Sequence, residues 1–335
     1  MIVESVKTTY FRLLRDLSLN FLPGINVLLG ANATGKTSIL EAIGYCLRGR
    51  SIIGANDMEI PSFGIAEFNV DVTVNNGSKQ NIKVAYDGHK VIHVNAKAVR
   101  STKELFDAFK LVAMTPANSL IATGPPSGRR DFLDDTAAQL SPVWAGVVTE
   151  YRATLQDRNA LLKRGNVPGL MEVLTLKLVE YGLDLRRIRQ EVTESLRKSL
   201  FTQGIDIELV EKGELSVEEF RKVAREEQAR GLTILGPHRD ECSFLLMNKR
   251  VERYASTGEA RRVMFLLKLA QADLIKRLSS QEPIILADDL LAELDPHNAN
   301  EALTKLSVYP QVLLTCAQQP EPGNYTIIQS TSWMK

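Results

Sequence analysis

The sequence predicts an α/β fold in which both ends of the chain build one mixed sheet and a helical lobe is inserted between them. Three observations predict this fold. A glycine-containing loop at 30–37 joins an apolar strand to an apolar helix. Alternating apolar residues from Phe68 to Val94 indicate an antiparallel meander, and a helical period runs from about 102 to about 230.

The composition is that of an ordinary globular protein with a sizeable core. The chain has 335 residues, of which 44% are hydrophobic and 24% charged. Lys and Arg number 41 against 40 Asp and Glu, so the formal net charge is +1. A chain without a basic excess can bind nucleic acid only through a local patch.

The cysteines and the N-terminal residues predict the cellular compartment of the protein. Cys46, Cys242 and Cys316 are far apart and show no Cys-x-x-Cys spacing, which favours reduced thiols. The N-terminal residues do not form a basic segment followed by an apolar one, and no apolar run approaches the roughly 18 residues of a membrane helix. We expect a cytoplasmic protein with no membrane partner.

The N-terminal strands come first in the predicted order. Residues 2–6, 17–21 and 25–29 have strand character, and the last is nearly all apolar, as in a strand buried on both faces. The meander then follows in three runs, separated by the turn residues Asn75-Asn76-Gly77 and Asp87-Gly88. We assign residues 1–101 to the first half of the sheet-containing lobe.

The helical period of 102–230 predicts the inserted lobe. Its leucines recur at helical spacing among charged residues, while prolines and glycines such as Pro116, Gly165 and Pro168 limit helix length and exclude long coiled coils. Strand-like segments return at 242–247, 284–287 and 312–315. Residues 231–335 are therefore predicted to complete the first lobe.

The loop at 30–37 predicts a site for a nucleoside triphosphate. Gly30 and Gly35 permit a tight wrap of backbone N–H groups around phosphates, Lys36 reaches the terminal phosphates, and the Thr37 hydroxyl suits Mg²⁺. A simple glycine turn between strand and helix is the alternative. The predicted ligands are ATP and Mg²⁺, and the residues that hold the nucleotide are Gly30, Ala31, Asn32, Ala33, Thr34, Gly35, Lys36, Thr37 and Ser38.

Two acids after the apolar strand 284–287 predict the rest of the catalytic centre. A magnesium–nucleotide site needs a carboxylate at the end of a neighbouring buried strand. We expect Asp288 to hold the metal through water and Asp289 to polarise the attacking water, with Lys36 as the second catalytic residue. A helix cap is the alternative reading of the two acids.

A third motif places the chain in a class of P-loop proteins. Ser256-Thr257-Gly258-Glu259 precedes an apolar-faced helix, follows the loop and comes before Asp288, which is the motif order of ATP-binding-cassette ATPases. By itself the motif is an equally good helix N-cap. The resemblance to that class implies a head-to-tail dimer in which Ser256, Gly258 and Glu259 cover the partner's nucleotide. It also implies that Glu293-Leu294-Asp295 resembles the D-loop of the dimer interface, and that Thr315 stands at the switch position, where histidine is common.

Nearly all of the chain resembles the RecF family of bacterial DNA replication and repair proteins. The matching segments are Tyr10-Phe11-Arg12, residues 21–27, Ser38 to Ile43, residues 126–134, Asp157 to Leu162 and Gly236-Pro237-His238-Arg239-Asp240. Ala33 departs from the pattern, since the family usually has glycine there. The resemblance implies an ATP-gated homodimer that binds DNA and works with a RecR-like mediator to load the RecA recombinase at gaps. It also adds Arg12 to the nucleotide-binding residues.

Basic side chains are the candidates for a DNA surface, and each has a solvated helix face or an ion pair as its alternative role. Contacts to phosphates predict sequence-independent, salt-sensitive binding to single-stranded, duplex, gapped or junction DNA. The candidates are Arg48, Arg50, Arg129, Arg130, Arg186, Arg187 and Arg189.

Three other functions stay open on the motifs alone. An energy-coupling ATPase of a transporter shares the three motifs, although a long insertion before the Ser256 motif disfavours it. A P-loop kinase or GTPase is disfavoured because Asn248-Lys249-Arg250-Val251 lacks the Asp of a guanine-specifying motif. A scaffold that does not hydrolyse ATP is the third.

Overall fold

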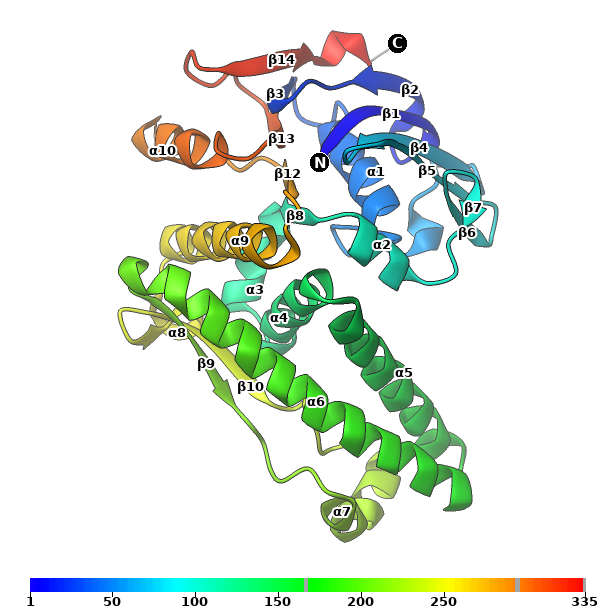
Figure 1. Ribbon diagram of the computed structural model, residues 1–335. Coiled ribbons are helices and arrows are strands. Elements are labelled where there is room, and N and C mark those ends of the chain that lie inside the picture. The colour runs from blue at the N-terminus through cyan, green and yellow to red at the C-terminus, as the bar shows by residue number, and fades with distance from the viewer. Residues whose placement is uncertain (166–167, 293–295, 334–335) are drawn as a thin grey trace. The chain divides into compact units, whose positions relative to one another are not determined.

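The computed structural model describes residues 1–165, 168–292 and 296–333. The chain divides into two compact units (Figure 1). Unit 1 contains Met1–Asn118 and Ile275–Lys335, and unit 2 contains Ser119–Leu274. Unit 1 is thus built from both ends of the chain.

A five-stranded parallel sheet carries the candidate site in unit 1. Its strand order is β14-β3-β13-β12-β8. All residues of β12 and β13 are buried, as expected for central parallel strands covered on both faces. The strands are β3 (Gly24–Leu29), β8 (Leu111–Met114), β12 (Ile284–Ala287), β13 (Gln311–Cys316) and β14 (Tyr325–Gln329).

The second sheet of unit 1 is antiparallel and confirms the predicted meander. Its order is β2-β1-β4-β5-β6-β7, and Ile82 pairs with Val72 on one side and with Val94 on the other. The mixed α/β fold predicted from the sequence is therefore present. The strands are β1 (Ile2–Phe11), β2 (Leu14–Asn20), β4 (Phe68–Asn75), β5 (Lys79–Tyr86), β6 (Lys90–Val94) and β7 (Lys97–Ala98).

Helix α1 (Lys36–Arg48) packs between these two sheets (Figure 1). Its apolar side chains, among them Ile39 and Ile43, share one core with Val72 of β4 and with Leu313 of β13. This burial on two sides fixes the helix N-terminus at the carboxyl edge of the parallel sheet. The other helices of unit 1 are α2 (Thr102–Ala108), α10 (Pro296–Leu306) and the 3₁₀ turns η1 (Asp57–Glu59), η2 (Pro116–Asn118) and η4 (Ser330–Ser332).

Unit 2 is mainly helical and contains a small antiparallel sheet of order β11-β10-β9. Helices α5 and α6 pack along one another (Figure 1). No helix in the ranges that the structure describes is long and apolar enough to cross a membrane. The elements are α3 (Ser119–Thr123), α4 (Pro126–Leu140), α5 (Pro142–Arg164), α6 (Pro168–Leu200), η3 (Phe201–Gln203), β9 (Ile205–Val210), α7 (Val217–Arg230), β10 (Glu241–Leu246), β11 (Lys249–Arg250), α8 (Val251–Tyr254) and α9 (Thr257–Ser279), whose last turns belong to unit 1.

The units divide at other points than the lobes expected at 102 and 230. Strand β8 pairs with β12 of the parallel sheet, so residues up to Asn118 stay with unit 1. Strand β10 pairs with β9, so unit 2 continues to Leu274. Strands β8, β9 and β14 were not predicted. The first two lie inside the segment of helical period, which hid their strand character.

Candidate functional site

The phosphate loop links β3 to α1 and has two residues in the left-handed region. Gly35 has φ 89° and Ala33 has φ 63°. A Cβ on Gly35 would lie 3.0 Å from Leu14 Cδ2, so both space and backbone conformation favour glycine there. Ala33 adopts a conformation that costs an L-residue about 1 kcal/mol, at a position where the family pattern has glycine.

The ammonium group of Lys36 lies inside the loop. Its Nζ donates to the carbonyl oxygens of Gly30 at 2.7 Å and of Ala31 at 2.8 Å, and only 5% of the residue is exposed. Because these partners are neutral, the positive charge of Lys36 stays available to an anion held in the loop.

Four side chains meet where the loop faces the ends of β12 and β13. The Thr37 hydroxyl donates to Asp288 Oδ1 at 2.9 Å, and the Thr315 hydroxyl donates to the same carboxylate at 2.8 Å. The backbone N–H of Asp289 donates to Thr315 Oγ1 at 2.8 Å. Asp289 itself has a left-handed φ of 46°, so the chain turns sharply after β12. The structure therefore brings together Thr37, both predicted acids and Thr315.

Burial raises the pKa of Asp288, and the neighbouring Asp289 carboxylate raises it further, while the hydroxyls of Thr315 and Thr37 oppose the shift. A buried carboxylate of this kind gains from a nearby cation. The donors at this point are hydroxyl and carboxylate oxygens, the atoms that Mg²⁺ prefers. The residues present therefore fit Mg²⁺. No cluster of three His, Cys, Asp or Glu side chains that could hold a metal occurs among the described residues.

The C-terminal segment borders the loop. A Cβ on Gly30 would lie 2.6 Å from Ser330 Cβ, and the indole Nε1 of Trp333 donates to the Thr34 carbonyl at 2.8 Å. Neither Ser330 nor Trp333 was predicted to contribute. No motif marks them, because the contacts depend on β14 pairing with β3.

Arg12 lies in the turn between β1 and β2 and binds α1. Its guanidinium makes a bidentate ion pair with Glu41, with N–O distances of 2.8 and 2.9 Å, and donates to the Glu59 carbonyl at 3.0 Å. Glu41 is 1% exposed, so this pair orients the turn. Leu14, the first residue of β2 after this turn, is the residue that leaves no space for a side chain at Gly35.

The Ser256 motif lies in unit 2, at the start of α9. Ser256 Oγ accepts from the Glu259 N–H at 3.3 Å, and Glu259 Oε2 accepts from the Ser256 N–H at 2.8 Å, which is a capping box. Ser256, Gly258 and Glu259 are all exposed, and a Cβ on Gly258 would meet no atom within 4 Å. The motif thus caps its helix and still presents an open surface. Asp295 lies outside the described residues.

Most arginines considered for DNA have structural partners. Arg186 pairs with Asp240 and Arg189 with Asp134, each at 2.8 Å, and both arginines are buried. Buried Arg129 donates to the Cys242 carbonyl, and buried Arg48 donates to the Phe109 carbonyl at 2.9 Å. Arg187 is exposed and pairs with Asp184 and Glu191 on its own helix, and Arg130 donates to the Asp240 carbonyl at 2.7 Å. Arg50 stacks over Phe106.

Sequence comparison finds relatives along the whole chain. A family model described as an AAA domain matches residues 5–119. A DNA replication and repair protein RecF of Lachnoclostridium phytofermentans is 31% identical, with 99% of each chain covered. The RecF of Symbiobacterium thermophilum is 30% identical, with 94% of this chain and 91% of the relative covered.

Solved structures give the same result. The recombination mediator protein RecF-ATP in the RecFOR pathway matches with a TM-score of 0.86 and 27% identity, over 96% of this chain and 93% of that one. An Smc head bound to the C-winged helix domain of ScpA matches with a TM-score of 0.52 and 15% identity, over 95% of this chain and 90% of that one, which shows a shared fold.

Proposed function

The chain belongs to the RecF family of DNA replication and repair proteins, and we propose that it is a magnesium-dependent ATPase whose ATP-bound form binds DNA. The observation that carries the proposal is the contact of Thr37 with Asp288 at 2.9 Å, beside Thr315 and Asp289. A loop that only turned the chain would not need a buried carboxylate opposite its threonine hydroxyl.

Each residue of the cluster has a proposed role in ATP binding and hydrolysis. The backbone of Gly30 to Ser38 cradles the phosphates, Lys36 neutralises their charge, and Arg12 lies in the turn beside the loop. Thr37 and Asp288 would hold Mg²⁺, which would supply positive charge to the phosphates during transfer. Asp289 polarises the attacking water, and Thr315 positions both acids.

We propose that two copies complete each site. Ser256, Gly258 and Glu259 are exposed, so they can reach the nucleotide of a second copy of the chain. The resemblance to ATP-binding-cassette ATPases assigns Asp295 to the same dimer interface. The first-turn N–H groups of Thr257 and Gly258 in α9, which precede the Glu259 N–H capped by Ser256, suit a γ-phosphate. ATP then closes the homodimer and hydrolysis releases it, which makes the nucleotide a timer for assembly.

The family membership supports the proposed cellular role. The dimer engages gapped, junction, single-stranded or duplex DNA without sequence preference, and works with a RecR-like mediator to load the recombinase at gaps in the cytoplasm. Slow, DNA-dependent hydrolysis limits how long it stays bound.

Replacement of Asp289 tests the mechanism. Asp289→Asn should lower ATP turnover about a hundredfold or more, while ATP-dependent dimers persist in sedimentation with gapped DNA. The matched control is Asp16→Asn, an exposed acid on β2 of the same unit, which should leave turnover and assembly unchanged. Unchanged turnover in Asp289→Asn would refute the assignment of Asp289. A wild-type protein that stays monomeric and ignores DNA at two salt concentrations would refute the proposed function.

A further inference from the structure

The segment Gly236 to Asp240 in unit 2 is anchored firmly at its end. Asp240 is buried, and its carboxylate accepts two hydrogen bonds from the Arg186 guanidinium, both at 2.8 Å. The same carboxylate accepts from the backbone N–H of Lys212 at 2.9 Å, and the Asp240 carbonyl accepts from Arg130 Nη1 at 2.7 Å. Asp240 therefore fixes the positions of the two segments that carry the basic side chains Arg130 and Lys212.

The middle of the segment is anchored as well. The Pro237 carbonyl accepts from Arg189 at 2.7 Å. His238 Nε2 lies 3.1 Å from the Thr233 carbonyl and Nδ1 lies 2.7 Å from Tyr151 Oη. A carbonyl only accepts, so Nε2 carries the ring proton and Nδ1 accepts from the tyrosine hydroxyl. His238 is thus fully engaged in holding the segment.

Arg239 is different from its neighbours. It is exposed, and its side chain makes no ion pair or hydrogen bond within the ranges that the structure describes. It lines a cavity of about 450 Å³ together with Arg130, Lys212 and Glu241. Three cations thus line the cavity with one carboxylate, which pairs with Lys212 at 2.5 Å.

Other features of this cavity favour an anion. Burial lowers the pKa of Arg130, and the nearby Arg189 lowers it further, so an anion beside Arg130 would stabilise its charged form. Pro126, the first residue of α4, also lines the cavity, and α4 has no side-chain cap and no acid in its first turn. The positive end of a helix adds to the attraction.

We propose that the cavity lined by Arg130, Lys212 and Arg239 binds a phosphodiester group of the DNA backbone. The proposal rests on the proposed function and gives the DNA-binding surface a location. Guanidinium groups bind phosphate oxygens in bidentate fashion, and such contacts position a protein on DNA without reading sequence. In this arrangement Pro237, His238 and Asp240 hold the segment, and Arg239 makes the contact.

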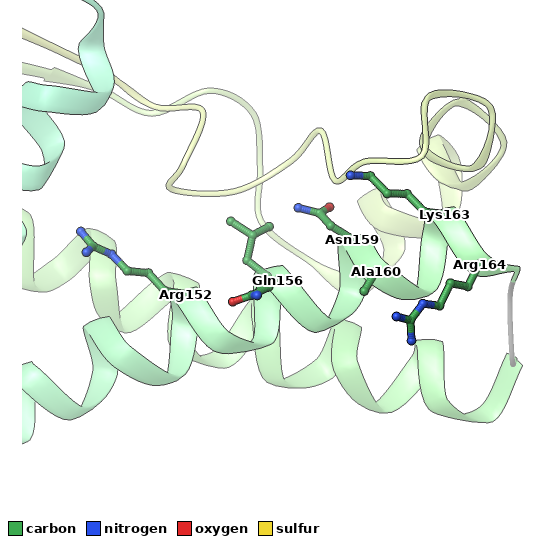
Figure 2. A pocket seen from close by; sticks show the side chains of 7 residues that line it. Arg152, Gln156, Asn159, Ala160, Lys163 and Arg164 are labelled. Carbon is green, nitrogen blue, oxygen red and sulfur yellow. The ribbon is translucent and has the colours of Figure 1, made fainter. Parts of the chain in front are cut away.

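A second basic cavity, on α5, offers a matched comparison (Figure 2). It has a volume of about 570 Å³ and is lined by Arg152, Lys163 and Arg164 among others. Arg152 is already paired with Asp131 at 2.6 Å and with Asp134 at 2.8 Å. Arg164 is exposed and lies at the end of the helix, so its charge resembles that of Arg239 without the anchored surroundings.

The test compares Arg239→Gln with Arg164→Gln in equilibrium binding to gapped DNA, with ATP present, over a series of salt concentrations. Arg239→Gln should weaken binding roughly tenfold at low salt and reduce the slope of log K against log salt by about one. Lys212→Gln should act in the same direction. Arg164→Gln should match the wild type. Thermal unfolding and ATP binding, measured on each variant, confirm that the fold and the nucleotide site are retained.

Two results would overturn this assignment while the proposed function stands. In one, the wild type binds DNA and Arg239→Gln binds it equally well with the same salt slope. In the other, Arg239→Gln and Arg164→Gln lose affinity equally, which indicates general attraction to basic residues. If the wild type does not bind DNA at all, the assignment and the proposed function both fail.

Discussion

Ser330 occupies the space that a side chain on Gly30 would need. A Cβ built on Gly30 would lie 2.6 Å from Ser330 Cβ and 2.7 Å from Ser330 Oγ. The φ of Gly30 is not in the left-handed region, so its backbone conformation is open to other residues. The first glycine of the phosphate loop is therefore required by packing against the C-terminal segment.

This relationship predicts a rescue. Gly30→Ala should displace the turn at Ser330 and weaken ATP binding about tenfold, because overpacking of a filled site costs about 1–3 kcal/mol. Ser330→Gly removes the clashing atoms, so the double variant should recover most of the affinity, as measured by calorimetric titration with ATP. A double variant as weak as Gly30→Ala would show that the glycine is needed for the approach of phosphate instead.

The Thr315 hydroxyl is predicted to matter for turnover more than for binding. It donates to Asp288 and accepts from the Asp289 N–H, both at 2.8 Å. Thr315→Val keeps the shape and removes both bonds, so the acids lose their fixed positions, and kcat should fall about tenfold or more while KM changes little. Thr315→Ser, which keeps the hydroxyl, should retain most of the rate. A rise in KM with kcat unchanged would contradict a positioning role.

The free energy of unfolding should fall in mild acid because of His238. Burial lowers the pKa of His238 to about 4 from the ordinary value of 6.5. As the pH falls through 6.5 the unfolded chain binds a proton that the native histidine does not bind until about pH 4, so stability is lost in this window. At pH 5 the loss from this group is about 2 kcal/mol.

Urea unfolding at pH 8 and pH 5 measures this effect. His238→Gln should lose most of the pH-dependent difference, whereas His89→Gln, at an exposed turn, should keep it. An equal pH dependence in wild type and His238→Gln would contradict the assignment.

Removal of one partner of a buried ion pair in unit 2 should strongly destabilise the protein. Arg158 Nη2 and Glu227 Oε2 are 2.6 Å apart, and their side chains are 3% and 0% exposed. Arg158→Met leaves the Glu227 carboxylate buried without its cation and should destabilise the protein by about 3–5 kcal/mol. Arg158→Met combined with Glu227→Gln should be less destabilised than Arg158→Met in thermal or urea unfolding. An additive double variant would show that the two residues do not interact.

The features predicted correctly from the sequence are those that depend on residues close together in the chain. The loop at 30–37 and the meander of β4, β5 and β6 depend on residues close together in the chain, and the structure contains both. The acids Asp288 and Asp289 were placed beside the loop because they follow an all-apolar strand, and Thr37 does contact Asp288.

The residue roles and strands that could not be predicted are those that depend on contacts between distant segments of the chain. Arg186 and Arg189 look like surface residues of a helix until their partners Asp240 and Asp134 are known. Strand β8 has four residues and no alternation, so it becomes recognisable only beside β12. The roles of Ser330 and Trp333 depend on the pairing of β14 with β3, whose partner residues are 300 positions apart (325−25).

The pairing of β14 with β3 also sets an order of events during synthesis. The loop emerges from the ribosome early. Strands β13 and β14, which flank β3 in the sheet, and Trp333, which donates to the loop, come from residues 311–333 and are translated last. At about 5–20 residues per second, the nascent chain spends many seconds with the loop exposed and its sheet incomplete. A ribosome stalled before the C-terminal strands would therefore carry a chain whose phosphate loop lacks its supporting strands, and we expect such a chain to bind nucleotide poorly.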